Sequence, residues 1–179
     1  MNRRPPLVHA LVWGAALVVG SAAHAAESGR NVDQTCPRIV ILGDADHSTS
    51  FDGSGRDVTD VVYKAKIASV DGDCRHKGEH QVNITVTATV TAEQGLAAKG
   101  NEISIPLFAA VIDPEELVVT KEQATATVKF ERGTRTGQAV AEFKTIKLEL
   151  SEDTVGEDLE VLVGLQLDKD QLDYLRSGH

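Results

Sequence analysis

Residues 44–52 carry side chains that could bind a metal ion. Oxygen-bearing residues stand at alternate positions there: Asp44, Asp46, Ser48, Ser50 and Asp52. Calcium prefers oxygen ligands, and this spacing resembles the first half of an EF-hand loop. The resemblance then ends, because Thr49 replaces the required glycine and Gly55 replaces the bidentate glutamate. We therefore interpret the segment as a polar loop between strands, with a calcium site as the alternative.

A second segment places a thiol, two imidazoles and a carboxylate close together in the chain. These groups belong to Cys74, His76, Glu79 and His80. An exported protein could bind copper or zinc through such residues. However, a cysteine in a disulfide is not a metal ligand, and two histidines alone make a weak site. The simpler interpretation is a solvated hairpin, and His76 with His80 stay as a candidate copper or zinc pair.

The sequence contains no recognisable catalytic frame. Ser48 or Ser50 beside His47 and Asp44 supplies the residue types of a hydrolase, yet no G-x-S-x-G elbow is present. Phosphate-binding loops, dinucleotide fingerprints and H-E-x-x-H are also missing from the sequence. The sequence thus predicts a protein that is not an enzyme and needs no cofactor, with a hydrolase as the remote alternative.

The N-terminal residues have the three parts of a secretory signal. Arg3 and Arg4 precede an apolar run over residues 7–20, and Ala23-His24-Ala25 forms an A-x-A-like cleavage site. We expect a signal peptide over residues 1–25, cleaved after Ala25, and a periplasmic location. The arginine pair leaves a twin-arginine signal as an alternative route. No apolar run reaches the length of a membrane span, so no transmembrane segment is predicted.

Charge and cysteine content limit the classes of partner and the cellular compartment that we expect for this protein. The formal net charge is −9, and loss of Arg3 and Arg4 with the signal makes it more negative. Nucleic acid and anionic membrane surfaces are therefore poor partners. Cys36 and Cys74 both remain after cleavage, and an even cysteine count in an exported chain predicts a disulfide. Because Cys36 follows Asp33-Gln34-Thr35 rather than an apolar run, no lipid anchor is expected.

Alternation of apolar and polar residues dominates the rest of the chain. In residues 82–92, valine, isoleucine and alanine alternate with asparagine and threonine, as in a strand with one solvated face. Similar patterns predict further strands at residues 38–43, 59–70, 103–112, 124–131, 138–150 and 159–167. About seven strands without long helices predict an all-β, immunoglobulin-like antiparallel β-sandwich over residues 36–179, after a flexible leader at 26–35. A closed barrel is the alternative.

Three local features refine this architecture. Pro106 cannot donate a ladder hydrogen bond, so its strand is predicted at a sheet edge or at a bulge. The apolar phase of residues 138–150 changes near Lys144-Thr145, which predicts a one-residue slip. Asp168 and Gln171 form a capping pair that predicts a short C-terminal helix. The sole tryptophan, Trp13, leaves with the signal, so any likeness to immunoglobulins is architectural.

Two stretches carry a resemblance to other proteins. Residues 55–65 read GRDVTDVVYKA, and VLVGLQL at 161–167 is followed by QLDY at 171–174. The chain resembles an uncharacterised group of alphaproteobacterial secreted proteins and lipoproteins with GRDLTDVxYEA-like and VLVGFQL…QLxY-like stretches. This resemblance implies an envelope location and a shared fold, and it supplies no catalytic residues.

Together these observations favour a non-enzymatic periplasmic module that acts in protein–protein interaction or envelope assembly. Its partner would be an unknown envelope protein, and the strand with Pro106 is the first candidate for an edge that accepts a partner strand. The alternative function is binding of a divalent metal, by the 44–52 loop or by His76 with His80.

Overall fold

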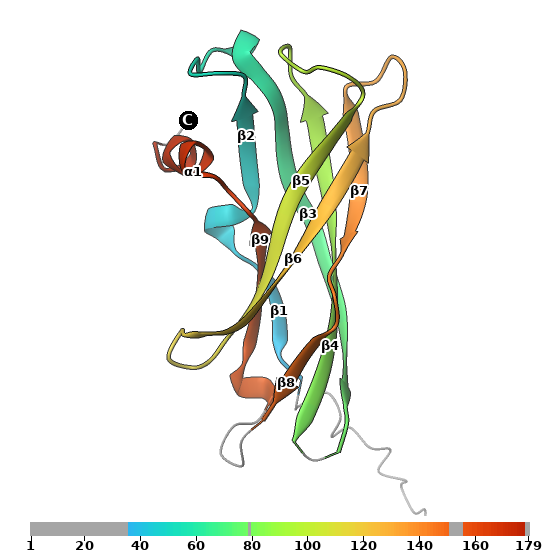
Figure 1. Cartoon of the computed structure of the whole chain (residues 1–179), viewed down its shortest axis with the longest axis vertical. Coiled ribbons are helices and arrows are strands. Elements are labelled where there is room, and N and C mark those ends of the chain that lie inside the picture. Colours follow the sequence, from blue (N-terminus) through green and yellow to red (C-terminus); the bar gives the residue numbers. More distant parts are fainter. Residues whose placement is uncertain (1–35, 79, 151–155, 178–179) are drawn as a thin grey trace, which may run out of the picture.

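The computed structural model describes residues 36–78, 80–150 and 156–177. Two β-sheets pack face to face, and a short helix follows the last strand (Figure 1). This arrangement confirms the predicted all-β sandwich. The described part of the chain has nine strands rather than about seven. The predicted signal peptide and leader, residues 1–35, lie outside the described residues.

Each sheet is built mainly from antiparallel pairs. The first sheet has the order β1 (Arg38–Ile41), β9 (Glu160–Leu165), β5 (Glu102–Ile112) and β6 (Val118–Lys129). The second has the order β2 (His47–Phe51), β3 (Val61–His76), β4 (Gln81–Gln94) and β7 (Thr136–Glu142), and β8 (Ile146–Glu149) also pairs with β4. Only the β1–β9 pair among these ladders is parallel.

The likeness to immunoglobulin domains is one of architecture, as expected. The β3–β4 and β5–β6 hairpins each stay within one sheet. In an immunoglobulin domain, by contrast, the consecutive strands B and C lie in different sheets. Two packed antiparallel sheets are the shared feature.

Strand β4 shows how the sequence builds the core. Its alternate residues point between the sheets and are at most 5% exposed: Val82, Ile84, Val86, Ala88, Val90 and Ala92. The intervening threonines lie on the outer face, as strand alternation requires. Apolar residues of β5 and β9, such as Leu107 and Val161, complete the same cluster from the other sheet. The strand predicted at 82–92 is therefore confirmed, slightly extended at both ends.

The phase change between β7 and β8 is the predicted one-residue slip. Thr87 of β4 faces Glu142, whereas Ile84 faces Ile146. The three residues between β7 and β8 therefore lie opposite only two residues of β4. The extra residue keeps the apolar side chains of both strands inside: Ala141, Phe143, Ile146 and Leu148 are all buried. The slip lies within residues 143–145, as the sequence predicted.

The sheet-edge position predicted for the Pro106 strand is wrong, because β5 lies inside the first sheet between β9 and β6. The register shift of the β5–β6 pair lies at Val111 and Ile112, far from the proline. Pairing with β9 begins only at Leu107, and the Pro106 carbonyl accepts a hydrogen bond from the Gln166 N–H at 2.8 Å, just beyond the end of β9. The N–H that proline lacks would point beyond the end of β9, so no hydrogen bond of the β5–β9 ladder is lost.

The C-terminal helix α1 (Lys169–Arg176) begins as predicted. The Gln171 N–H donates to the Asp168 carboxylate at 2.8 Å, and the Asp168 N–H donates to the Gln171 side chain at 3.0 Å. Leu172 and Leu175 are half-buried, and α1 packs beside β2 (Figure 1). No helix among the described residues is long and apolar enough to cross a membrane.

Two edges of the sandwich are protected. On one side the C-terminal end of β6 comes against the edge strand β7, since a Cβ at Gly137 would lie 2.7 Å from Val128 and 2.9 Å from the Lys129 carbonyl. On the other side α1 lies beside the edge strand β2. Such covering prevents unwanted strand pairing.

Candidate functional site

The predicted disulfide joins Cys36 to Cys74, with Cα atoms 6.0 Å apart. Cys74 and His76 stand two residues apart on β3, so their side chains share one face. The ligand atoms of Cys36, Cys74 and His76 all lie within 4.8 Å of one another, and all three residues are half-buried. Within residues 36–78, 80–150 and 156–177 this is the one such group of three His, Cys, Asp or Glu side chains. His80 is not in it.

The predicted calcium loop has a different structure. Asp44 lies in a 3-10 turn over Gly43–Ala45, and the residues from His47 onward form strand β2. Prediction of a loop over residues 44–52 is therefore wrong over residues 47–51. Ser48 and Ser50 share one face of β2 but are spread along an extended strand, so the side-chain oxygens of the segment do not encircle one point. Asp44 and Asp46 are not brought together with a third ligand among the described residues.

The hydrolase residue types are also separated by β2. His47 is exposed and contacts the Asp46 carboxylate through Nδ1. Ser48, its neighbour in the strand, is 6% exposed and faces inward. Adjacent strand residues point in opposite directions, so this serine and this imidazole do not meet.

A polar cavity lies beneath the start of α1. Its volume is about 200 Å³, and it is lined by residues of β2, β3, β5, the end of β9, the segment that follows it, and the helix: Ser48, Ser50, Tyr63, Ile105, Pro106, Leu165, Gln166, Leu167, Asp168 and Gln171. Burial raises the pKa of the Tyr63 hydroxyl above its ordinary value, while hydrogen bonds with Gln171 and Ser50 act to lower it. Sequence analysis found Asp168 and Gln171 only as a helix cap, because the cavity depends on contacts between distant segments.

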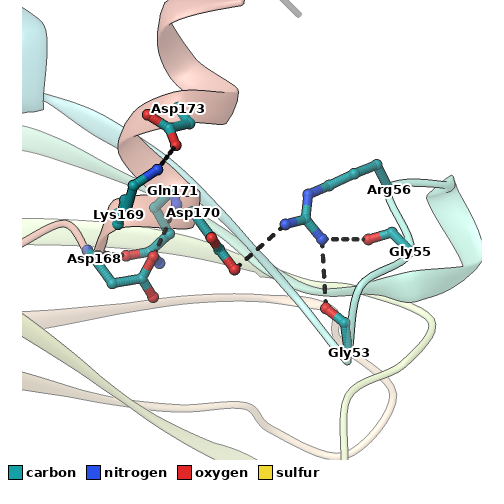
Figure 2. A network of polar contacts seen from close by, with 8 residues as sticks. All are labelled: Gly53, Gly55, Arg56, Asp168, Lys169, Asp170, Gln171 and Asp173. Atoms are coloured by element: carbon teal, nitrogen blue, oxygen red, sulfur yellow. Dashed lines mark hydrogen bonds and ion pairs between the residues drawn. The ribbon is translucent and has the colours of Figure 1, made fainter.

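Arg56 connects α1 to the loop before β3 (Figure 2). Its guanidinium donates to the Gly55 carbonyl at 2.7 Å and to the Gly53 carbonyl at 3.4 Å. It also lies 3.5 Å from an Asp170 carboxylate oxygen in the first turn of the helix. The Arg56 Cζ lies over the Phe51 ring, 5.0 Å from its centre. The arginine therefore binds two segments that are more than one hundred residues apart in sequence.

The GRDVTD residues at 55–60 form a compact structural unit. Asp57 and Asp60 make a reciprocal capping box around the 3-10 turn Val58–Asp60. A side chain at Gly55 would overlap the Asp60 carboxylate. Phe51 and Tyr174 meet edge to face with ring centres 4.8 Å apart, which adds an aromatic contact to the attachment of α1. These residues hold the helix in place.

On the helix itself, Lys169 and Asp173 form an ion pair one turn apart. The hydrogen bond between them raises the pKa of Lys169 and lowers the pKa of Asp173. Both side chains are exposed, so the pair orders the helix surface and adds little to stability.

The β5–β6 hairpin presents the most concentrated apolar surface of the described residues. Leu117, Val118 and Val119 are consecutive and are 64%, 61% and 53% exposed. Their turn is well ordered, because the Asp113 carboxylate accepts hydrogen bonds from the Leu117 N–H at 2.8 Å and the Glu115 N–H at 3.1 Å. The hairpin projects from the side of the sandwich (Figure 1). Contiguous exposed apolar residues mark interaction sites.

This surface was not predicted from the sequence, because the alternating pattern of the strand begins only at residue 124. The consecutive apolar residues 117–119 interrupt the alternation that identified the other strands. The register shift between Val111 and Ile112 explains the interruption. An apolar run directly after the Asp113-Pro114 turn was the signal that could have revealed it.

Glu116 in this turn offers a test of the hairpin geometry. It has a φ of 61°, in the left-handed region that costs an L-residue roughly 1–2 kcal/mol. Glycine avoids that cost, although it gains freedom in the unfolded chain. We expect Glu116→Gly to raise the free energy of unfolding by about 0.5–1 kcal/mol, measured by urea denaturation. The matched variant Glu115→Gly should not stabilise, and equal effects of the two would contradict the assigned turn.

The chain was compared with protein-family models, with curated proteins and with solved structures, and none of them matches it.

Proposed function

We propose that this protein is an exported, non-enzymatic module of the periplasm that binds another envelope protein. The binding surface is the open edge of β6 together with the apolar residues at its start. The bound partner contributes an extended segment that pairs with β6 as an additional strand, a common mode of peptide recognition. The observation that carries the proposal is the exposed group Leu117, Val118 and Val119 at the end of an edge strand.

The backbone of β6 supports this mode of binding. Its ladder partner is β5 alone. The Phe130 N–H donates to the Asn101 carbonyl, so alternation directs the even-numbered residues of β6 toward β5. Lys121 and Gln123 therefore direct their N–H and C=O groups away from β5, where an added strand would find them.

The first half of β6 is the part that a partner can reach. Gly137 brings β7 against the other half, near Val128 and Lys129. The edge strands β1 and β8 have four residues each, and α1 lies beside β2. Apolar side chains at residues 117–119 add contact area to the backbone hydrogen bonds, which by themselves carry little specificity.

Gln123→Pro tests the proposed edge. Proline removes the outward N–H of residue 123 and leaves the hydrogen bonds toward β5 in place, as Pro106 does on the far side of β5. A photo-crosslinking residue at position 119, in protein expressed in its native host, should give one defined product with an envelope protein. We expect Gln123→Pro to reduce this product by about tenfold or more, since it removes a backbone hydrogen bond and places a ring in the interface.

Gln123→Ala is the matched control and should leave the crosslinked product unchanged, because the alanine keeps its N–H. Circular dichroism of the proline variant checks that the sandwich still forms. If both variants retain the product, or if alanine reduces it as much as proline, strand addition at β6 is wrong.

A further inference from the structure

We propose that reduction of the Cys36–Cys74 disulfide creates a binding site for a thiophilic d¹⁰ cation, Zn²⁺ or Cu⁺, at the end of the sandwich where this disulfide lies. The ligands are the two thiolates and the imidazole of His76. This inference is independent of strand addition at β6, and it uses a different face of the molecule. The sequence indicated His76 with His80 as the candidate pair, without Cys36.

The geometry already gathers three suitable donor atoms. The sulfurs of Cys36 and Cys74 and a ring nitrogen of His76 all lie within 4.8 Å of one another. Zinc bonds to sulfur at about 2.3 Å and to nitrogen at about 2.0–2.1 Å, which places tetrahedral ligand atoms roughly 3.4–3.8 Å apart. Opening the S–S bond lets the sulfurs separate to this spacing through side-chain rotation, with the Cα atoms staying near their separation of 6.0 Å.

The backbone around the site is supported without the disulfide. Cys74 faces Ile84 within the long β3–β4 pair, and His76 faces Val82 in the same ladder. Cys36 lies two residues before β1, which pairs with β9 over four residues. The donor atoms are thus carried by strands whose positions depend on sheet hydrogen bonds. A prearranged set of ligands lowers the ordering cost of binding.

The donor set selects the class of ion. Thiolate and imidazole ligands favour Zn²⁺ and Cu⁺, whereas Ca²⁺ and Mg²⁺ require oxygen ligands. Three protein ligands satisfy trigonal Cu⁺ directly and leave one position of tetrahedral Zn²⁺ for water. All three residues are half-buried, so a reductant and an ion can reach them.

The disulfide and the metal exclude each other. A dithiol reductant, such as a thiol–disulfide oxidoreductase of the exported compartment, supplies two electrons and two protons and becomes a disulfide itself. Cys36 and Cys74 then carry thiols. Binding of the cation displaces both thiol protons, so the thiolates coordinate and two protons enter the solvent. The disulfide form of such an oxidoreductase reverses the sequence: it accepts two electrons from the thiolates and two protons from solvent and becomes a dithiol, while the Cys36–Cys74 bond forms again and the ion is released.

Titration of the reduced and the oxidised protein tests the site. Zn²⁺ and Cu⁺ are added separately under anaerobic conditions to the pre-reduced chain. We expect one equivalent of at least one ion to bind about 100-fold more tightly to the reduced protein than to the oxidised protein. Co²⁺ as a spectroscopic substitute should show sulfur-to-cobalt charge-transfer absorption. Equal affinities in the two redox states, for both ions, would overturn the proposal.

Two histidine variants separate this site from adventitious binding. His76→Ala should weaken binding by about tenfold or more, because it removes one of three ligands. His80→Ala is the matched control, since the imidazole of His80 is outside the group, and it should bind normally. Equal losses in both variants would contradict the assignment. If the reduced protein unfolds, Zn²⁺ or Cu⁺ should restore its circular dichroism, and failure of both to do so counts against the site.

Discussion

Replacing Cys36 and Cys74 together with serine is expected to lower the free energy of unfolding by about 3–4 kcal/mol. The crosslink closes a loop between cysteines 38 residues apart, and loss of a loop of this size releases unfolded-chain entropy worth roughly that amount. For a domain of this length the melting temperature should fall by roughly 10 °C. Differential scanning calorimetry at neutral pH measures both quantities.

The position of the crosslink explains why its loss should destabilise both sheets. Cys36 precedes β1 of the first sheet, and Cys74 lies on β3 of the second sheet. The bond therefore joins the sheets at one end of the sandwich. The serine variant should be insensitive to reductant, whereas reduced wild type should match it. A loss below about 1 kcal/mol would show that the strand pairs alone keep the sheets together.

Deleting Thr145 is expected to be the most destabilising single change outside the disulfide. The deletion removes the extra residue that brings Ile146 and Leu148 into the core phase of β8. A one-residue shift in a strand turns every side chain to the opposite face. Exposure of these two buried residues costs about 3–6 kcal/mol, which should be measured by guanidinium denaturation.

Lys144→Ala is the control for the deletion. Lys144 is exposed and lies in the same segment, so this substitution should change the free energy of unfolding by less than about 0.5 kcal/mol. If the deletion variant unfolds at the same denaturant concentration as wild type, the slip has no role in fixing the register of β8.

The features that the sequence predicted are those with a local signal. Strand β4 could be identified because apolar and polar residues alternate along most of its length. The slip before Ile146 could be inferred because apolar phase is visible on both sides of it. The capping pair Asp168 and Gln171 acts within one turn, so its consequence did not depend on the rest of the fold.

The features that it missed depend on distant segments. Strand β2 consists of His-Ser-Thr-Ser-Phe and has no apolar row, so pairing with β3 makes it a strand. Pro106 is tolerated inside a sheet only because β9 ends at Leu165. No property of the residues around the proline contains that information.

The candidate sites divide in the same way. The even count of cysteines, together with the predicted signal peptide, was enough to predict the disulfide. His76 lies close to both sulfurs for two reasons. Strand alternation puts it on the same face of β3 as Cys74, and the pairing of β1 with β9 places Cys36. The edge of β6 required knowledge of the strand order, which local patterns do not provide.

The pairing of the first strand with the last has a consequence for how the molecule folds during synthesis. Arg38 of β1 donates to the Glu160 carboxylate at 3.0 Å across a separation of 122 residues. A chain that emerges from its N-terminus cannot complete this contact until almost all of it has arrived. Contacts between residues so far apart in sequence raise the contact order, and a high contact order slows folding. During that interval β5 still lacks one of its two neighbours, so a chaperone that binds unpaired strands would act at this stage.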